Sequence, residues 1–116
     1  MNLNQTFKTG IFLKMSLDEY YKSYLKLHKN KNCIRMHVLG QLVTISYVIA
    51  VLIAAYIYDV KYTVLLLLSP FVIYPFAWAG HYFFEKNKPA AFSNPIKAKI
   101  CDWKMLYDII KGKIKL

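Results

Sequence analysis

The sequence predicts an all-α membrane protein, a hairpin of two transmembrane helices flanked by N- and C-terminal amphipathic helices at the membrane interface. Two stretches without formal charge support this fold class, residues 38–58 with 21 residues and residues 62–84 with 23. A helix needs roughly 20 residues to cross the hydrocarbon core of a bilayer, so each stretch is long enough. The alternative is two buried helices of a soluble domain. It would require the remaining, very basic residues to cover two helices that are apolar on all sides, and a chain of 116 residues is too short for that.

The distribution of basic residues predicts the topology. The net charge is +10, and of the 16 Lys and Arg residues seven precede the first stretch, eight follow the second, and Lys61 lies between them. This positive-inside pattern is typical of an integral membrane protein with both termini cytoplasmic, in a bacterial inner membrane or the endoplasmic reticulum. The lysines would then contact anionic lipid headgroups. A nucleic-acid-binding protein can have the same charge but does not explain this distribution, and we expect no nucleic-acid partner.

A single membrane domain is expected over residues 16–116, after a loosely ordered extension at residues 1–15. Its first helix, residues 16–29, begins at Ser16, which can form a capping box with Glu19. The helix is too short and too charged to cross a membrane. We therefore expect it at the interface, with its tyrosine-rich face against the membrane or the hairpin.

The two spans are expected at residues 36–58 and 62–85, and the short connection makes them antiparallel neighbours. Gly40 and Gly80 remove side-chain bulk and favour a close approach of the two helices. Two prolines, at positions 70 and 75, predict a kink in the second span. The kink is either purely structural, or it widens the space near the end of the span and leaves a cleft for a lipid tail.

The last helix is expected at residues 95–114, with Asn94 as its cap and Pro95 at its first position. Apolar side chains recur on it at steps of three and four, as on a helix that lies in the headgroup plane. A helix used for dimerisation is the alternative. The apolar stripe consists of Ile96, Ile100, Trp103, Tyr107, Ile110 and Ile114.

Three histidines are expected at one end of the hairpin. His37 and His81 are each 22 residues from Asp59 in the turn, so antiparallel helices bring them to the same depth. Packed helices lie about 8–10 Å apart, which lets two inward-pointing imidazoles share one metal ion. His28 ends the preceding helix and can fold back toward them. Any one of these histidines could be an ordinary interfacial residue, but three at one membrane face favour a metal site.

Other polar residues near these histidines allow several roles. Glu85 follows His81 by four residues, which on a helix offers a nitrogen and an oxygen ligand from one face, although Glu85 could also pair with a nearby basic residue. Three imidazoles, with or without a carboxylate, suit iron(II), zinc or manganese. Asp102 can bind the metal, hydrogen-bond a ligating histidine or, by default, pair with a neighbouring lysine. Cys33 and Cys101 are expected to be reduced and to serve in packing.

Three motifs carry a resemblance to a known family. The first is the run YYKSYLKLHKNKNCIRMHVLG at residues 20–40. The second is Trp78-Ala79-Gly80-His81, followed by Glu85-x-Asn87-Lys88-Pro89-Ala90, and the third is Asp102-x-x-Met105. Together the chain resembles, over about residues 16–110, the small membrane proteins typified by the endoplasmic-reticulum 2-hydroxy-fatty-acid dioxygenase, a group formerly catalogued as a domain of unknown function.

The resemblance implies an iron(II)-dependent dioxygenase of fatty-acid α-oxidation at the cytoplasmic membrane face. Such an enzyme uses O2 to convert a 2-hydroxy fatty acid into a fatty acid one carbon shorter and CO2. The implied site has Fe2+ as its cofactor, with Arg35 steering the substrate carboxylate and Glu85 as a fourth ligand or a support. The alternative is a non-enzymatic hairpin protein that acts in assembly or membrane shaping. The remaining implied residues are the metal ligands His28, His37 and His81 and the polar supports Asn32, Asn87 and Asp102.

Overall fold

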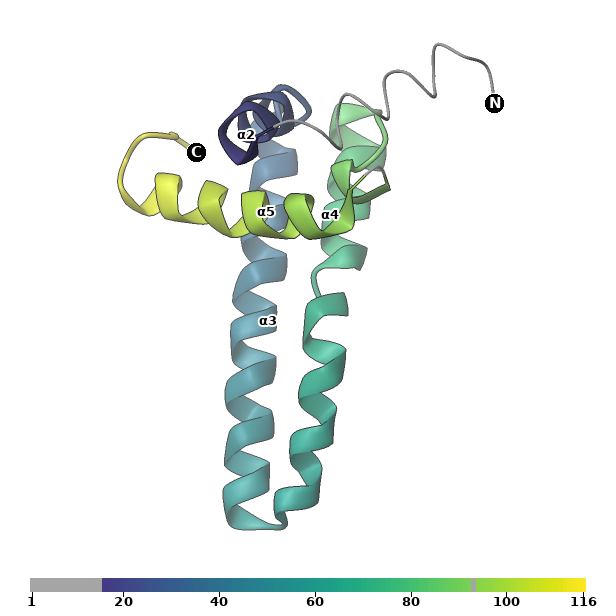
Figure 1. Cartoon of the computed structure of the whole chain (residues 1–116), viewed down its shortest axis with the longest axis vertical. Helices are drawn as coiled ribbons and strands as arrows, with labels where there is room; N and C mark the ends of the chain where they lie inside the picture. The colour runs from purple at the N-terminus through teal and green to yellow at the C-terminus, as the bar shows by residue number, and fades with distance from the viewer. Residues whose placement is uncertain (1–15, 93) are drawn as a thin grey trace.

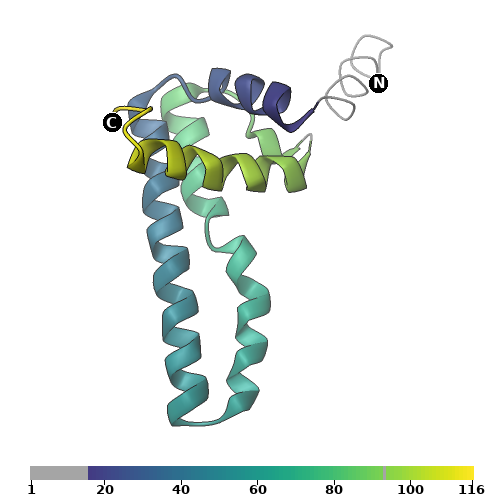
Figure 2. The same cartoon turned by 60° about the vertical axis from the view of Figure 1, so that its left-hand side comes forward.

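The computed structural model describes residues 16–92 and 94–116, and this part of the chain contains helices and no strand. The prediction of an all-α fold is confirmed for these residues. The extension predicted at residues 1–15 lies outside them. Two long legs run side by side, and shorter helices form a cap across one end of them (Figures 1 and 2).

The first leg is one continuous helix, α3 (Lys31–Ile57). Asn30 caps it, because its side chain accepts a hydrogen bond from the backbone N–H of Asn32 at 2.8 Å. The helix therefore begins before residue 36, where the sequence pattern had placed its start. At 1.5 Å per residue its 27 residues extend for about 40 Å, which exceeds the roughly 30 Å of a hydrocarbon core.

The second leg changes its winding twice. It consists of the 3₁₀ helix η1 (Val60–Phe71), the α-helix α4 (Tyr74–Gly80) and the π-helix η2 (His81–Glu85). A break separates η1 from α4 and is visible in both views (Figures 1 and 2). Pro70 precedes the break and Pro75 follows it, and neither has a backbone N–H to continue a helical ladder. The kink predicted from the two prolines is present.

Glycines bring the two legs together at the capped end. A Cβ added to Gly40 would lie 2.9 Å from both Ile73 Cγ1 and Phe76 Cβ, too close for any real contact. A Cβ added to Gly80 would lie 3.2 Å from Cys33 Sγ. The close approach predicted at both glycines is confirmed, and it positions the histidines described below.

Both legs are long and apolar enough to cross a membrane, over Lys31–Ile57 and Val60–Glu85. In the most apolar 18-residue window of each leg, only 22% and 17% of the residues are buried within the protein. The central helices of a soluble domain would be mostly buried. The exposed apolar legs therefore favour the membrane interpretation of the sequence over the soluble alternative.

The cap contains α2 (Leu17–Lys26) and α5 (Pro95–Ile110), with the short 3₁₀ helix η3 (Ala90–Phe92) leading into α5. The tyrosine-rich face of α2 packs against α5 as well as the start of α3, a contact with α5 that the sequence did not predict. The resulting core lies at the capped end. It consists of Tyr20, Tyr21, Tyr24, Ile34, Ala90, Ala98, Cys101 and Met105.

Five of the six residues of the predicted apolar stripe are exposed, whereas the sixth, Ile114, packs against the core. The five members within α5 are between 37% and 74% exposed. The predicted end at residue 114 is wrong, because Gly112 takes a φ of 81° that ends the helix, and α5 stops at Ile110. The exposed members are Ile96, Ile100, Trp103, Tyr107 and Ile110.

Candidate metal centre

Three histidines from three separate segments meet where the cap joins the legs. His28 lies in the loop after α2, His37 lies on α3, and His81 is the first residue of η2. The Nε2 atom of His37 is 3.1 Å from Nε2 of His28 and 3.3 Å from Nε2 of His81. All three side chains are buried, none being more than 4% exposed. His37 and His81 thus lie at the same depth, as their equal separation from Asp59 in the sequence predicts.

The outer nitrogen of each imidazole has its own hydrogen-bond acceptor. Nδ1 of His28 lies 2.7 Å from the backbone oxygen of Tyr24, and Nδ1 of His37 lies 2.8 Å from Oδ1 of Asp102. A carbonyl and a carboxylate oxygen can only accept, so both Nδ1 atoms carry the hydrogen. In a neutral imidazole, Nε2 then bears the lone pair.

Asn87 fixes His81 in the same way. The amide nitrogen of Asn87 donates to the backbone oxygen of Leu27 at 3.1 Å, which leaves its Oδ1 facing Nδ1 of His81 at 2.6 Å. The imidazole therefore donates from Nδ1 and presents its Nε2 lone pair to the other two histidines. The wide turn of η2 brings Asn87, six residues after His81, close enough for this contact.

The chemistry of these atoms fits a metal ion. The Nε2 lone pair of His37 lies 3.1 Å from that of His28 and 3.3 Å from that of His81, with no hydrogen between them to share. A cation at their centre would satisfy all three at once, and imidazole suits zinc, copper, iron and nickel. Histidine ligands whose second nitrogen donates to a carbonyl or carboxylate are typical of metal sites, because that bond fixes the ring orientation.

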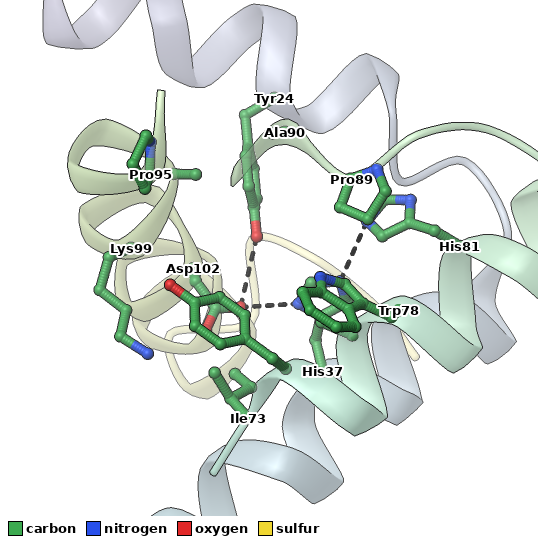
Figure 3. A pocket seen from close by; sticks show the side chains of 13 residues that line it. Tyr24, His37, Ile73, Trp78, His81, Pro89, Ala90, Pro95, Lys99 and Asp102 are labelled. Atoms are coloured by element: carbon green, nitrogen blue, oxygen red, sulfur yellow. Dashed lines mark hydrogen bonds and ion pairs between the residues drawn. The ribbon is translucent and has the colours of Figure 1, made fainter. Parts of the chain in front are cut away.

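Asp102 contacts His37 instead of the lysine that the sequence suggested by default. Its side chain is buried, and Oδ1 also accepts from the Tyr24 hydroxyl at 3.3 Å (Figure 3). Burial, and then the Asp102 carboxylate, raises the pKa of Tyr24 well above its ordinary value, so this hydroxyl keeps its proton and donates. The backbone oxygen of Asp102 accepts from Nε2 of Gln41 at 2.7 Å.

Burial keeps His28 in the form that binds metal. Desolvation, and after it the neighbouring His37, lowers the pKa of His28 to about 2, although the hydrogen bond with the Tyr24 backbone opposes the shift. The imidazole is therefore neutral at physiological pH, with its Nε2 lone pair available.

Sequence reasoning missed a fourth donor, Cys33, and assigned it to packing. Its Sγ and one nitrogen from each of the three histidines all lie within 4.8 Å of one another. The signal was present in the sequence, because Cys33 precedes His37 by four residues and therefore shares its face of α3.

Three other predicted site residues lie outside this group. The Glu85 carboxylate accepts a hydrogen bond from the backbone N–H of Asn30 and so holds η2 against the start of α3. The α-helical spacing that would put Glu85 beside His81 does not apply, because η2 is wound as a π-helix. Arg35 is exposed and donates to Asn32 Oδ1 at 3.1 Å.

A pocket opens beside His37 and His81, between α4 and α5 (Figure 3). The pocket is small, with a volume of about 30 Å³, and has Trp78 on one side and Lys99 on the other. Its lining is mainly apolar, with the histidines and Asp102 among its few polar groups. The histidine cluster therefore borders an apolar pocket with few polar groups, which is the usual character of a small-molecule site.

Residues 14–114 match the family described as 2-hydroxy-palmitic acid dioxygenase Mpo1-like. The chain belongs to this family. The match confirms the resemblance inferred from the histidine, glutamate and asparagine motifs, and the description of the Mpo1-like family suggests a dioxygenase that acts on a 2-hydroxy fatty acid. No curated protein and no solved structure matches the chain.

Proposed function

We propose that this member of the Mpo1-like family is an iron(II)-dependent dioxygenase that shortens 2-hydroxy fatty acids at the cytoplasmic face of a membrane. The observation that carries the proposal is the convergence of three Nε2 lone pairs, each set by a hydrogen bond at Nδ1. The family description supports the substrate class and the use of O2.

The reaction balances without a further reductant. A 2-hydroxy acid, R–CH(OH)–COOH, and one O2 give R–COOH, CO2 and H2O, so the four electrons that O2 accepts come from the two carbons of the head. An iron(II) ion held by His28, His37 and His81 would supply the redox chemistry with O2. The protein binds and orients the head beside these residues, and the apolar pocket keeps bulk water away from it.

The side chains around the histidines hold them in one geometry. Asp102 adds a negative charge behind His37 and thereby makes its Nε2 a stronger donor. Asn87 fixes the ring of His81, and the Tyr24 carbonyl fixes that of His28. We propose that Glu85 supports the site indirectly, through its contact with Asn30.

We further propose that both long legs cross the bilayer, with both termini cytoplasmic. The exposed apolar surface of the legs supports the crossing, and the lysines around the cap, against the single Lys61 at the far turn, support the orientation. The histidines would then lie at the membrane edge, where the head of a membrane-dissolved fatty acid lies.

Iron binding and turnover together test the proposal. Protein purified in detergent and loaded anaerobically with Fe2+ should hold one iron per chain, and with O2 it should convert 2-hydroxypalmitate to the fifteen-carbon acid and CO2, followed by mass spectrometry. His37→Ala and His81→Ala should lose both properties, whereas Thr63→Ala at the far turn should keep them. If no histidine substitution lowers the iron content, the proposal of a metal centre at these histidines is wrong. Histidine-dependent iron without turnover would favour the non-enzymatic alternative.

A further inference from the structure

Lys99 is the basic residue that the structure places beside the candidate metal centre. It lies on α5, three residues before Asp102, and lines the same pocket as His37 and His81. Figure 3 shows it on the α5 side of this pocket, opposite Trp78 and His81. The sequence had favoured Arg35 for a role in substrate binding, but Arg35 lines none of the pockets described here.

Lys99 also borders a second hollow, an apolar groove on the outside of the legs. The groove is open to the surface, has a volume of about 340 Å³ and lies between α3, η1 and the first half of α5. Lys99 thus lies where the groove along the legs adjoins the pocket beside the histidines. The groove is lined mainly by Ile45, Val48, Ile49, Pro70 and Trp103.

The ammonium group of Lys99 has three hydrogen-bond donors, more than its one hydrogen bond within the described residues uses. It donates one hydrogen bond to the backbone oxygen of Pro70 at 2.6 Å, at the break in the second leg, and lies 5.2 Å from the centre of the Tyr74 ring. Over residues 16–92 and 94–116, no carboxylate oxygen lies within 4.0 Å of it. Burial lowers the pKa of Lys99, and the negative charge of Asp102 partly offsets this shift. An ammonium has three donors, so a ligand anion can bind here without displacing Pro70.

We propose that Lys99 binds the carboxylate of the 2-hydroxy fatty acid, whose acyl tail lies in the groove between α3 and η1. This assignment rests on the proposed function. The occupant follows from the chemistry of the two hollows: an apolar groove along the legs, a lysine without a carboxylate partner among the described residues where the groove adjoins the pocket, and the histidine cluster beside that pocket. A single-chain acid with its polar head at one end matches that order, and the 2-hydroxyl next to the carboxylate would point toward the histidines.

Binding measurements without O2 test this independently of turnover. We would measure the affinity of 2-hydroxypalmitate and of its uncharged methyl ester for the anaerobic, iron-loaded protein in detergent. Lys99→Met should weaken binding of the acid by roughly 10- to 100-fold, the range of one charge-assisted hydrogen bond, and leave the ester unchanged. Lys99→Arg should restore most of the affinity for the acid. Lys113→Met removes the same charge from an exposed position and should leave the affinity for both ligands unchanged.

A second variant tests the tail. Val48→Trp narrows the groove and should weaken the binding of the acid and of the ester alike. Unchanged acid binding by Lys99→Met, or a loss seen in Arg35→Met but not in Lys99→Met, would overturn the assignment, as would a wild type that binds neither ligand. If binding depends on Lys99 but the protein does not convert 2-hydroxypalmitate, the carboxylate site is supported and the proposed dioxygenase activity is refuted. Failure of the carboxylate site can therefore be told apart from failure of the proposed function. Retained ester binding shows that Lys99→Met is folded.

Discussion

Nδ1 of His37 lies 2.8 Å from Oδ1 of Asp102, and this contact joins α3 to α5 across 65 positions of the sequence. Both side chains are buried, so the pair lies away from bulk water. The contact makes the last helix of the cap part of the candidate metal centre rather than a covering for it.

We expect Asp102→Asn to lower metal affinity by about 10- to 100-fold, because the amide removes the negative charge behind His37 and can present a donor to it. Competition with a chelator of known affinity measures the change. Asp108→Asn is the matched control, since Asp108 is also buried on α5 and accepts from the Tyr21 hydroxyl at 2.5 Å. Equal losses of metal affinity in both variants would mean that Asp102 affects metal binding only through the stability of the fold.

We expect Cys33 to remain a thiol when metal binds. A thiolate added to three imidazoles would close a four-coordinate site of the structural zinc type, whereas oxygenase chemistry needs open positions. The Co2+-substituted protein should therefore lack an intense sulfur-to-cobalt absorption band in the near ultraviolet. Cys33→Ala should bind metal within about threefold of the wild type. A band that disappears in Cys33→Ala would identify the thiolate as a ligand and contradict the open site.

Gly40→Ala should lower stability and metal affinity together. The added Cβ would meet Ile73 and Phe76 at 2.9 Å and push α3 away from α4, at a cost of about 1–3 kcal/mol in unfolding free energy. The shift would also separate His37 from His81. Thermal unfolding and chelator competition measure the two effects. Gly112→Ala introduces strain at a φ of 81° but meets open space, so it should lower stability without changing metal affinity.

Trp103 should contact the bilayer, because the exposed face of α5 is apolar and Trp103 borders the groove along the legs. In liposomes, a Trp78→Phe variant leaves Trp103 as the reporter, and lipids with brominated acyl chains should quench its fluorescence. Replacing Ile96 and Ile110 with Asp should reduce that quenching by lifting α5 from the surface. Quenching by aqueous acrylamide alone would place α5 in water.

The sequence predicts the helical fold and the meeting of the histidines because these depend on regular spacing. His37 and His81 are each 22 residues from Asp59, and this equal count places both at the same end of the hairpin even though the second leg is not one continuous α-helix. Contacts that depend on irregular winding could not be predicted in the same way. Glu85 contacts Asn30 because η2 is a π-helix, and nothing in the four-residue spacing from His81 shows that.

The positions of Lys99 and Asp102 illustrate the second limit. Both lie on α5, and their placement depends on the angle at which α5 crosses the legs, which is set by packing of its buried face on the tyrosines of α2. A pattern of apolar residues identifies the stripe of α5 but not which neighbour the opposite face meets. The sequence therefore allowed three roles for Asp102, and only the packed cap selects one of them.

The order of these residues along the chain has a consequence for biosynthesis. His28, His37 and His81 are made first, and Asp102, the partner of His37, arrives only with α5. During translation the three imidazoles therefore exist for a time without the group that orients one of them. If the cluster binds a metal ion, we expect tight binding to require the final helix, so a nascent chain that stops after the second leg would hold the ion only weakly and could release it.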